Sequence, residues 1–345
     1  MRFAFLSLSL LLAACAVPTE PEEGTSTDDL TTVPACLPTI ACEAPKLSYQ
    51  TRGWRRWSST LVSRIGDPHH RGRDMFVNPG APQWVLGKIT YGLTDKDLRG
   101  EEVDVFVQRD CASGWEKVGT AVTTHDGEHA AMEGVADNGG RVYFEIPRDK
   151  RLGPGRHRVR LVVAGDGTFT DSFIDVVPRD TKIFVSDVDG TLTESENAEY
   201  LAIAKGVQPG THPGAPEALR ALVAKGYRPM YLTARPEILT SRTREFLEKH
   251  GFPPGIIHTS SQTTGAGVGS TASSFKSDEM KLLAEKGLTP TFAFGNKSTD
   301  SEAYTSVTGV EHRVFYKIEG AFDGRRIESY EELVPGYEAL PEVCK

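Results

Sequence analysis

The sequence lacks an excess of basic residues. Its 39 lysines and arginines are outnumbered by 47 aspartates and glutamates, which gives a formal net charge of −8. Domains that bind nucleic acid usually carry a strong positive charge, so this balance argues against a nucleic-acid partner without excluding a local basic patch. The remaining composition, 39% apolar and 25% charged in 345 residues, is typical of a globular chain with two domains.

Long apolar runs are also absent, so no transmembrane helix is predicted. The apolar stretch at residues 3–12 follows Arg2 and is far shorter than the ~20 residues that span a bilayer. Such a stretch predicts a secretory signal. It ends in Leu-Ala-Ala-Cys, which is similar to a bacterial lipobox. We therefore interpret residues 1–14 as a lipoprotein signal peptide and Cys15 as the acylated anchor, with an ordinary secretory signal as the alternative.

The residues after the lipobox indicate where the anchored protein resides. Ala16, rather than aspartate, follows the cysteine and favours the outer membrane of a Gram-negative cell. We expect an exported protein, anchored through Cys15 at the periplasmic face of the outer membrane or at the cell surface. Residues 15–46 are rich in Pro, Thr, Glu, Asp and Ser without periodicity, which predicts a flexible tether.

Cysteine is scarce, and its spacing matches no zinc site. Four cysteines remain besides the anchor: Cys36, Cys42, Cys111 and Cys344. Because export makes disulfides permissible, this even number fits two bridges, with three possible pairings that the sequence leaves open. The sequence also leaves the oligomeric state open.

Apolar residues between positions 54 and 65 follow a helical period. They fall on one stripe of a helix: Trp54, Trp57, Leu61, Val62 and Ile65. Because four arginines flank the stripe, one interpretation is an amphipathic helix that lies on an anionic membrane surface. The other is a helix that packs on the protein's own domain, as most amphipathic helices do. We expect this helix and a loop to occupy residues 47–73.

Residues 74–178 show the short alternating pattern of an all-β domain. Turn signals such as Asp126-Gly127 separate seven predicted strands: 83–91, 102–108, 115–123, 129–135, 141–146, 157–163 and 168–177. Seven strands in roughly a hundred residues fit an immunoglobulin-like sandwich. This segment carries no catalytic constellation, so we expect it to serve packing, positioning or recognition.

Residues 179–345 alternate between strand and helix. The predicted strands are 182–186, 229–233, 256–259, 291–294 and 313–316, and the predicted helices are 216–225, 236–250, 275–286 and 300–307. This alternation of strands and helices predicts an α/β domain with a parallel sheet covered by helices on both faces. The loops that follow the strands of such a sheet meet at its carboxyl edge, where ligands bind.

Chemically active side chains follow the strands of this domain: Asp187, Asp189, Gly190 and Thr191 after the first, Thr233 and Arg235 after the second, Lys276 on a later helix, and Asn296 and Asp300 after the fourth. We interpret this set as a site for phosphate esters. An anionic nucleophile and an anionic phosphate repel each other unless a cation lies between them. Asp187, Asp300 and the backbone carbonyl of Asp189 would hold Mg²⁺ there.

The residue types predict separate roles. Asp187 would attack phosphorus and form an aspartyl-phosphate, while Asp189 would protonate the leaving alkoxide and then deprotonate the attacking water. Thr233 and Lys276 would bind the nonbridging phosphate oxygens. Gly190 would let the turn approach the phosphate closely.

Two further residues complete the predicted substrate contacts. We place Thr191 beside the substrate together with Gly190, because both follow directly on the aspartates. Arg235 either contacts the phosphate or pairs with a carboxylate at a helix start, and the sequence does not decide between these roles.

The motif Asp187-Val188-Asp189-Gly190-Thr191 resembles motif I of the haloacid dehalogenase (HAD) superfamily, and Thr233, Lys276 and Asp300 fall at its later motifs. The sequence around Thr233 and Asn296 is similar to that of the catalytic domain of lipins, the Mg²⁺-dependent phosphatidate phosphatases. This resemblance covers residues 180–335. It implies a HAD-like Rossmannoid sheet, phosphatidate as the substrate, and a set of Mg²⁺ ligands: Asp187, Asp189, Asn296 and Asp300.

The chain also departs from the lipins. Thr233 stands where they usually carry serine, and either hydroxyl serves. The loop at 263–274 is rich in glycine and serine, unlike theirs, which leaves the choice of substrate open. Related domains in phosphatidylinositol-transfer proteins bind phosphatidate without turning it over. Both motif I aspartates are intact here, which favours catalysis.

The predicted domain has no room for a large cap. The connections after Leu192 and after Arg235 are each under ~45 residues and largely occupied by helices. A capless site is open to a headgroup in a membrane, so we expect a phospholipid partner and conversion of phosphatidate to diacylglycerol. The alternatives are a soluble periplasmic phosphomonoester and phosphatidate binding without catalysis.

Overall fold

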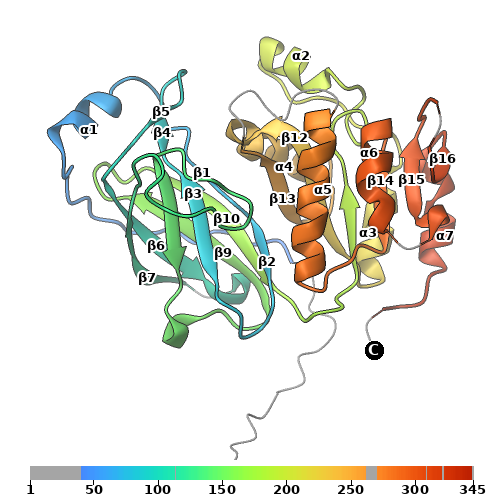
Figure 1. The fold of residues 1–345 in the computed structure, drawn as a ribbon, viewed down its shortest axis with the longest axis horizontal. Coiled ribbons are helices and arrows are strands. Elements are labelled where there is room, and N and C mark those ends of the chain that lie inside the picture. Colours follow the sequence, from blue (N-terminus) through green and yellow to red (C-terminus); the bar gives the residue numbers. More distant parts are fainter. Residues whose placement is uncertain (1–39, 113, 262–269, 308, 321, 344–345) are drawn as a thin grey trace, which may run out of the picture. The chain divides into compact units, whose positions relative to one another are not determined.

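The computed structural model describes residues 40–112, 114–261, 270–307, 309–320 and 322–343 (Figure 1). The predicted signal peptide, the anchor Cys15 and most of the tether lie outside these ranges, as do Cys36 and Cys344. Within them, Cys42 is joined to Cys111 by a disulfide. Among the described residues, no helix has the length and apolar character needed to cross a membrane.

The N-terminal domain is a β-sandwich. One sheet has the strand order β1 (Arg71–Gly72), β3 (Trp84–Lys88) and β8 (Arg141–Glu145). The other has the order β2 (Met75–Val77), β10 (Phe169–Val176), β9 (Gly155–Val163), β6 (Glu102–Gln108) and β7 (Trp115–Val122). A small hairpin joins β4 (Thr90–Tyr91) to β5 (Lys96–Asp97), and 3₁₀ turns lie at Arg109–Cys111 and Arg148–Lys150.

The sandwich core forms from alternate residues of both sheets. Val85 from one sheet and Val105, Leu161 and Val163 from the other are buried in a single apolar cluster. Apart from the parallel pair β2 and β10, the strand pairs are antiparallel, which suits alternation between a buried and a solvated face. The all-β prediction is therefore confirmed, although β1 begins before residue 74, the predicted start of the domain.

The predicted strand at 129–135 is wrong. This stretch is a loop with one isolated bridge between Met132 and Val135. The chain reverses at Glu133 and Gly134, which both have positive φ angles, so no extended strand continues through them. The Asp137 carboxylate accepts the backbone N–H of His129 at 2.9 Å and stabilises the loop instead.

The predicted amphipathic helix is short. Helix α1 spans Trp57–Val62. Trp54 and Val62 pack against the sandwich core, whereas Trp57 is 80% exposed. Leu61 and Ile65 are also exposed. The apolar stripe therefore has two parts, one docked on the domain and one facing solvent.

The C-terminal domain has a six-stranded parallel sheet in the order β13 (Ile256–Ser260), β12 (Arg228–Pro236), β11 (Ile183–Ser186), β14 (Phe292–Gly295), β15 (Arg313–Tyr316) and β16 (Arg325–Ile327) (Figure 1). The helices are α2 (Ala198–Lys205), α3 (Ala215–Ala224), α4 (Thr240–Lys249), α5 (Ser270–Glu285), α6 (Ser298–Ala303) and α7 (Val334–Glu338). Turns of 3₁₀ helix occupy Glu237–Leu239, Tyr304–Ser306, Val310–His312 and Tyr330–Glu332. The parallel α/β prediction is confirmed.

Alternation along β11 explains how helices cover both faces of this sheet. Phe184 packs in one cluster with Leu219 of α3, while Val185 packs in another with Leu283 of α5. Successive side chains of a strand point to opposite faces, so a continuously apolar strand needs a cover on each side. The central strand is therefore fixed between two helical layers, which holds its carboxyl end in place.

Some boundaries in this domain differ from the prediction. Pro236 does not open a helix but is the last residue of β12, with φ −62° and ψ 146°. Helix α4 begins only at Thr240, after a 3₁₀ turn. Helix α5 begins at Ser270, earlier than expected. The sequence analysis also missed α2, β16 and α7, which are short or weakly periodic.

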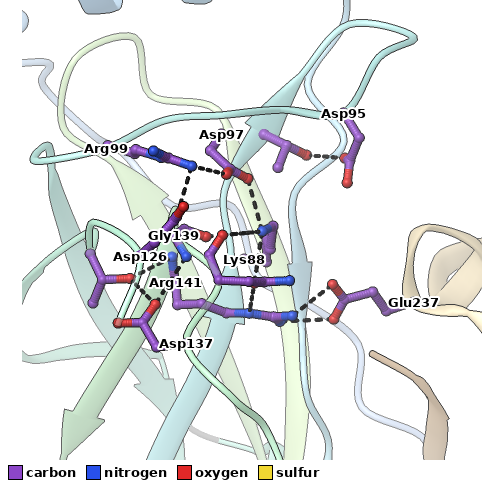
Figure 2. Close-up of polar contacts among 12 residues, drawn as sticks. Lys88, Asp95, Asp97, Arg99, Asp126, Asp137, Gly139, Arg141 and Glu237 are labelled. Atoms are coloured by element: carbon purple, nitrogen blue, oxygen red, sulfur yellow. Dashed lines mark hydrogen bonds and ion pairs between the residues drawn. The ribbon is translucent and has the colours of Figure 1, made fainter. Parts of the chain in front are cut away.

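Buried ion pairs join the two domains, which belong to one compact unit. Glu237 follows β12 and accepts hydrogen bonds from Arg141, a pair that Figure 2 shows, and from Arg71. The distances are 2.8 and 2.9 Å to Arg141 and 3.0 Å to Arg71. Arg71 and Arg141 come from sandwich strands, and their side chains are only 6% and 4% exposed. Because the carboxylate serves two buried guanidinium groups, it fixes the sandwich against the end of β12.

A buried histidine in the sandwich makes stability depend on pH. His70 accepts the backbone N–H of Thr90 at Nδ1, and its Nε2 lies 2.8 Å from the Thr168 hydroxyl, so the neutral ring fits this site. Burial lowers the pKa of His70 to about 4. A lowered folded-state pKa means that the unfolded chain binds the proton more tightly. The resulting stability is complete above pH ~6.5 and is lost as the pH falls towards 4.

We expect His70 to account for about 2–3 kcal/mol of the unfolding free energy lost between pH 6.5 and 4.5. The measurement is denaturant unfolding at several pH values for the wild type and His70→Gln. The variant should show a smaller decrease in stability over this range. His125→Gln, at a partly exposed histidine, is the matched control and should retain the wild-type slope. An unchanged slope in His70→Gln would contradict the assignment.

Candidate active site

The candidate site lies at the carboxyl edge of the parallel sheet, where its central strand ends. The backbone N–H of Asp187 donates to the carbonyl of Phe294 at 2.9 Å, so the residue continues the pairing of β11 with β14. Asp187 is 5% exposed. The carboxylate is therefore held by regular sheet structure on a rigid element, which favours precise positioning.

A tight turn follows this aspartate. Gly190 has φ +72°, a left-handed conformation that favours glycine, and a Cβ atom there would also meet the side-chain ends of Asn296 and Glu196. The Thr191 hydroxyl lies 2.9 Å from Asp187 Oδ2 and 3.1 Å from Asn296 Oδ1. The turn thus brings three of the predicted residues, at 187, 191 and 296, into one hydrogen-bonded group.

Lys276 of α5 bridges two carboxylates. Its ammonium lies 2.6 Å from Asp187 Oδ1 and 2.5 Å from Asp300 Oδ1, and all three side chains are buried. The second oxygen of Asp300 accepts the backbone N–H groups of Asn296 and Lys297 at 2.9 and 3.0 Å. Each carboxylate oxygen therefore has a defined partner, and the group forms one rigid network.

Burial and charge act in opposite directions on this group. Burial raises the pKa of Asp187 to about 7, although the Lys276 ammonium opposes the shift. Burial alone would lower the pKa of Lys276, but Asp187 and Asp300 outweigh it and hold that pKa well above its usual value. Lys276 therefore remains a cation, placed to stabilise negative charge on a nucleophile or a phosphate.

Asp189 points to the second strand rather than to this network. Arg235 donates from Nε and its second terminal nitrogen to the Asp189 carboxylate at 2.9 and 2.7 Å, and the Thr233 hydroxyl donates at 3.1 Å. The Arg235 guanidinium also lies 3.3 Å from Glu199. Arg235 thus pairs with a carboxylate in this structure, one of the two roles that the sequence left open.

Three residues near the site were missed by the sequence analysis. Glu196 accepts the side-chain amide of Asn296 and pairs with Lys297 at 2.5 Å. Glu199 on α2 holds Arg235, and His212 lies with Nε2 3.2 Å from the Gly190 carbonyl. These residues follow the motif in a stretch without strand periodicity. For the two glutamates, the one signal was the spacing of three acidic residues within 194–199; His212 had none.

The oxygen donors at the site fit a hard divalent cation by their chemistry. Asp187 and Asp300 offer carboxylates, Asn296 an amide oxygen and Asp189 a backbone carbonyl, which are the ligand types that Mg²⁺ prefers. Within the described residues, however, no three or more acidic, histidine or cysteine side chains form a metal-binding group. Lys276, rather than a shared metal position, joins the two carboxylates here.

Comparison with known families identifies both domains. Residues 184–319 match the family described as PITM 1-3, LNS2 domain, and residues 68–176 match PITM 1-3, beta-sandwich domain. The C-terminal domain is an LNS2 domain. LNS2 domains are HAD-like and related to lipins, as the resemblance of the sequence to both groups predicts.

Individual relatives match more than half of the chain. Mouse membrane-associated phosphatidylinositol transfer protein 3 is 32% identical over 206 residues, which cover 59% of this chain and 19% of that protein. The human type 2 protein is 33% identical over 206 residues, covering 59% and 14%. Retinal degeneration B from Drosophila melanogaster is 31% identical over 256 residues, covering 74% and 18%. The chain thus spans less than a fifth of each relative.

Proposed function

We propose that this LNS2 domain is a Mg²⁺-dependent phosphomonoesterase with Asp187 as the nucleophile. The observation that carries the proposal is the buried network in which Asp187 Oδ1 faces Lys276 and Asp187 Oδ2 faces Thr191. A carboxylate fixed by a cation and a hydroxyl at the carboxyl edge of a parallel sheet is suited to attack an electrophile in the loops above it.

The chain's residues divide the two displacements between them. Asp187 attacks phosphorus, the ester P–O bond breaks, and Asp189 donates a proton to the departing alkoxide. Asp189 then accepts a proton from water, which attacks the aspartyl-phosphate and releases inorganic phosphate and free Asp187. Thr233 and Lys276 donate to the phosphate oxygens. For Asp189 to act, its carboxylate must exchange part of its contact with Arg235 for the substrate.

Mg²⁺ would be held by Asp187, Asp300, Asn296 and the Asp189 carbonyl, and it would screen the repulsion between nucleophile and phosphate. Lys276 already supplies one positive charge to both carboxylates. Lys276 is in place without substrate, and it would share this task with the metal.

Phosphatidate is the favoured substrate. The lipin relationship of LNS2 domains supports a phospholipid, and the names of the mouse and human relatives describe membrane-associated phosphatidylinositol transfer proteins. The exposed part of α1 adds a physical reason, because Trp57 and Leu61 face solvent beside basic residues and suit an anionic membrane surface. We further propose that the protein is exported and anchored through Cys15, which would keep the site near its substrate.

The test is phosphate release from phosphatidate vesicles in Mg²⁺, beside release from glycerol 3-phosphate and p-nitrophenyl phosphate. We expect release from the vesicles to exceed release from the soluble esters at equal phosphate concentration. Asp189→Asn should reduce it at least ~10²-fold, because general acid–base catalysis contributes this much. Release from soluble esters alone would contradict the lipid substrate. Vesicle binding without release from any ester would leave a phosphatidate-binding module.

A further inference from the structure

A cavity lies at the opposite edge of the sheet from Asp187. Its volume is about 420 Å³, within the ~300–1,000 Å³ typical of small-molecule sites. The loop at 252–255 lines it and leads into the amino end of β13, whereas Asp187 follows the carboxyl end of β11. The remaining walls come from β9, β10, α4 and residues 41–44. This cavity is therefore separate from the candidate active site.

Three arginines surround one aromatic ring in this cavity. The guanidinium carbons of Arg156, Arg158 and Arg244 lie 4.4, 5.0 and 4.6 Å from the centroid of Phe173. Cations over an aromatic face are attracted to it, but three like charges around one ring also repel one another. Anions are therefore needed to balance this group.

The available carboxylates balance two of the three arginines. Arg156 pairs with Asp175 at 2.9 Å, and Arg244 pairs with Asp74 at 2.8 Å. Among the described residues, the one ion pair found for Arg158 is a 3.7 Å contact with Asp171. Asp171 is already engaged, since it accepts two hydrogen bonds from the neighbouring Arg160 at 2.7 and 2.8 Å. Arg158 is thus the weakly balanced member.

The surroundings of Arg158 also lack groups that would balance its positive charge. Its side chain is 14% exposed, and its Nε is buried without a hydrogen-bond partner among the described residues. Burial lowers the pKa of Arg158, and Arg160 and Arg244 lower it further by repulsion. Glu248 lies near enough to oppose this, but it is exposed at the rim and forms no ion pair with Arg158 in the described structure. Among the described residues the Nε of Arg156 also lacks a partner, so the feature that distinguishes Arg158 is its lack of a close ion pair.

Apart from the exposed Glu43 and Glu248, the rest of the wall is largely apolar. Leu247, Phe252 and Ile257 are buried in the domain core and present their surfaces to the cavity beside Pro253 and Pro254. A small inorganic anion would leave this surface uncovered. A ligand with an anionic head and an alkyl body would satisfy both the guanidinium and the apolar wall.

We propose that this cavity binds an amphipathic anion, with a carboxylate or phosphate head on Arg158 and its alkyl body against Phe252 and the two prolines. The head accepts hydrogen bonds from Arg158 and neutralises the charge that Asp171 leaves unbalanced. The site goes beyond the proposed phosphatase chemistry and does not depend on it.

Calorimetric titration of the full chain in EDTA tests the proposal. The probes are dodecyl phosphate and dodecanoate below their critical micelle concentrations, with inorganic phosphate as the arm that lacks an alkyl body. Arg158→Met should raise the dissociation constant of both amphiphiles about 10- to 100-fold, the range for one charge-assisted hydrogen bond to a charged head. Arg326→Met, at an exposed arginine on β16, should leave both constants unchanged.

Three results would overturn the site. The first is equal binding of dodecanoate to the wild type and Arg158→Met, because dodecanoate lacks the phosphate that the active site would recognise. The second is binding of inorganic phosphate as tight as that of dodecyl phosphate, which would remove the role of the apolar wall. Thermal unfolding of Arg158→Met shows whether the variant still folds, so that a loss of binding is not mistaken for misfolding. If Arg158 is a poorly balanced buried charge, its replacement by methionine leaves the Tm unchanged or raises it. The third result is a Tm decrease of more than ~4 °C, which would show that Arg158 is a structural cation.

Discussion

Replacing Asp187 by asparagine is expected to reduce kcat/KM for phosphate release at least ~10³-fold, because the amide has no anionic oxygen to attack phosphorus. The side chain keeps its size, and Oδ can still accept from Thr191. The decrease should therefore appear in kcat on every ester that the wild type hydrolyses, with the fold intact by near-ultraviolet circular dichroism.

The matched control is Asp278→Asn on the same helix as Lys276. Asp278 is 68% exposed and pairs with Lys281, so its neutralisation removes the same charge without touching the site. We expect this control to retain activity within about twofold. Activity of Asp187→Asn above a tenth of the wild-type value would assign the nucleophile to another residue.

Replacing Glu237 by glutamine is expected to lower the free energy of unfolding by about 3 kcal/mol. Glutamine removes the negative charge that Arg71 and Arg141 share, and the side chains of both arginines are nearly inaccessible to water. Arg71 retains Asp95 at 2.6 Å, so Arg141 loses more. Burying an uncompensated guanidinium costs several times more than removing a surface ion pair.

Urea denaturation measures this effect against a matched substitution. Glu217→Gln breaks an ion pair with Arg220 on the surface of α3, where the two side chains are 53% and 48% exposed. We expect that change to cost less than ~0.5 kcal/mol. Equal costs for Glu217→Gln and Glu237→Gln would mean that the contact between the domains contributes no more than an exposed pair.

The fold could be predicted where the sequence follows a strict period. The strands predicted at 182–186, 102–108 and 115–123 appear at 183–186, 102–108 and 115–122, because burial on both faces or on one face dictates each pattern. The stretch 129–135 alternates as well, but a side-chain acceptor, Asp137, satisfies its backbone and overrides the pattern. A side chain that competes in this way for backbone hydrogen bonds cannot be recognised from the periodicity of apolar residues.

The candidate site also has a part that the sequence predicts and a part that it does not. Strand ends place Asp187 and Asn296 at one edge of the sheet, and this follows from the parallel order alone. The partners of Asp189 do not follow from it. Arg235 and Glu199 meet only because α2 folds over the loop after the motif, and α2 carries too weak a pattern to be predicted. The interdomain role of Glu237 likewise needs two arginines that are distant in sequence.

The most direct test of the phosphatase proposal is the initial rate of phosphate release from phosphatidate vesicles by the wild-type chain, measured in Mg²⁺ and again in EDTA. We predict continuous release in Mg²⁺ and a decrease of at least ~10²-fold in EDTA, because nucleophile and phosphate are both anionic. Release that is the same in both solutions would contradict the role of the metal. No release in Mg²⁺ would contradict the assignment of Asp187 as a nucleophile towards phosphatidate.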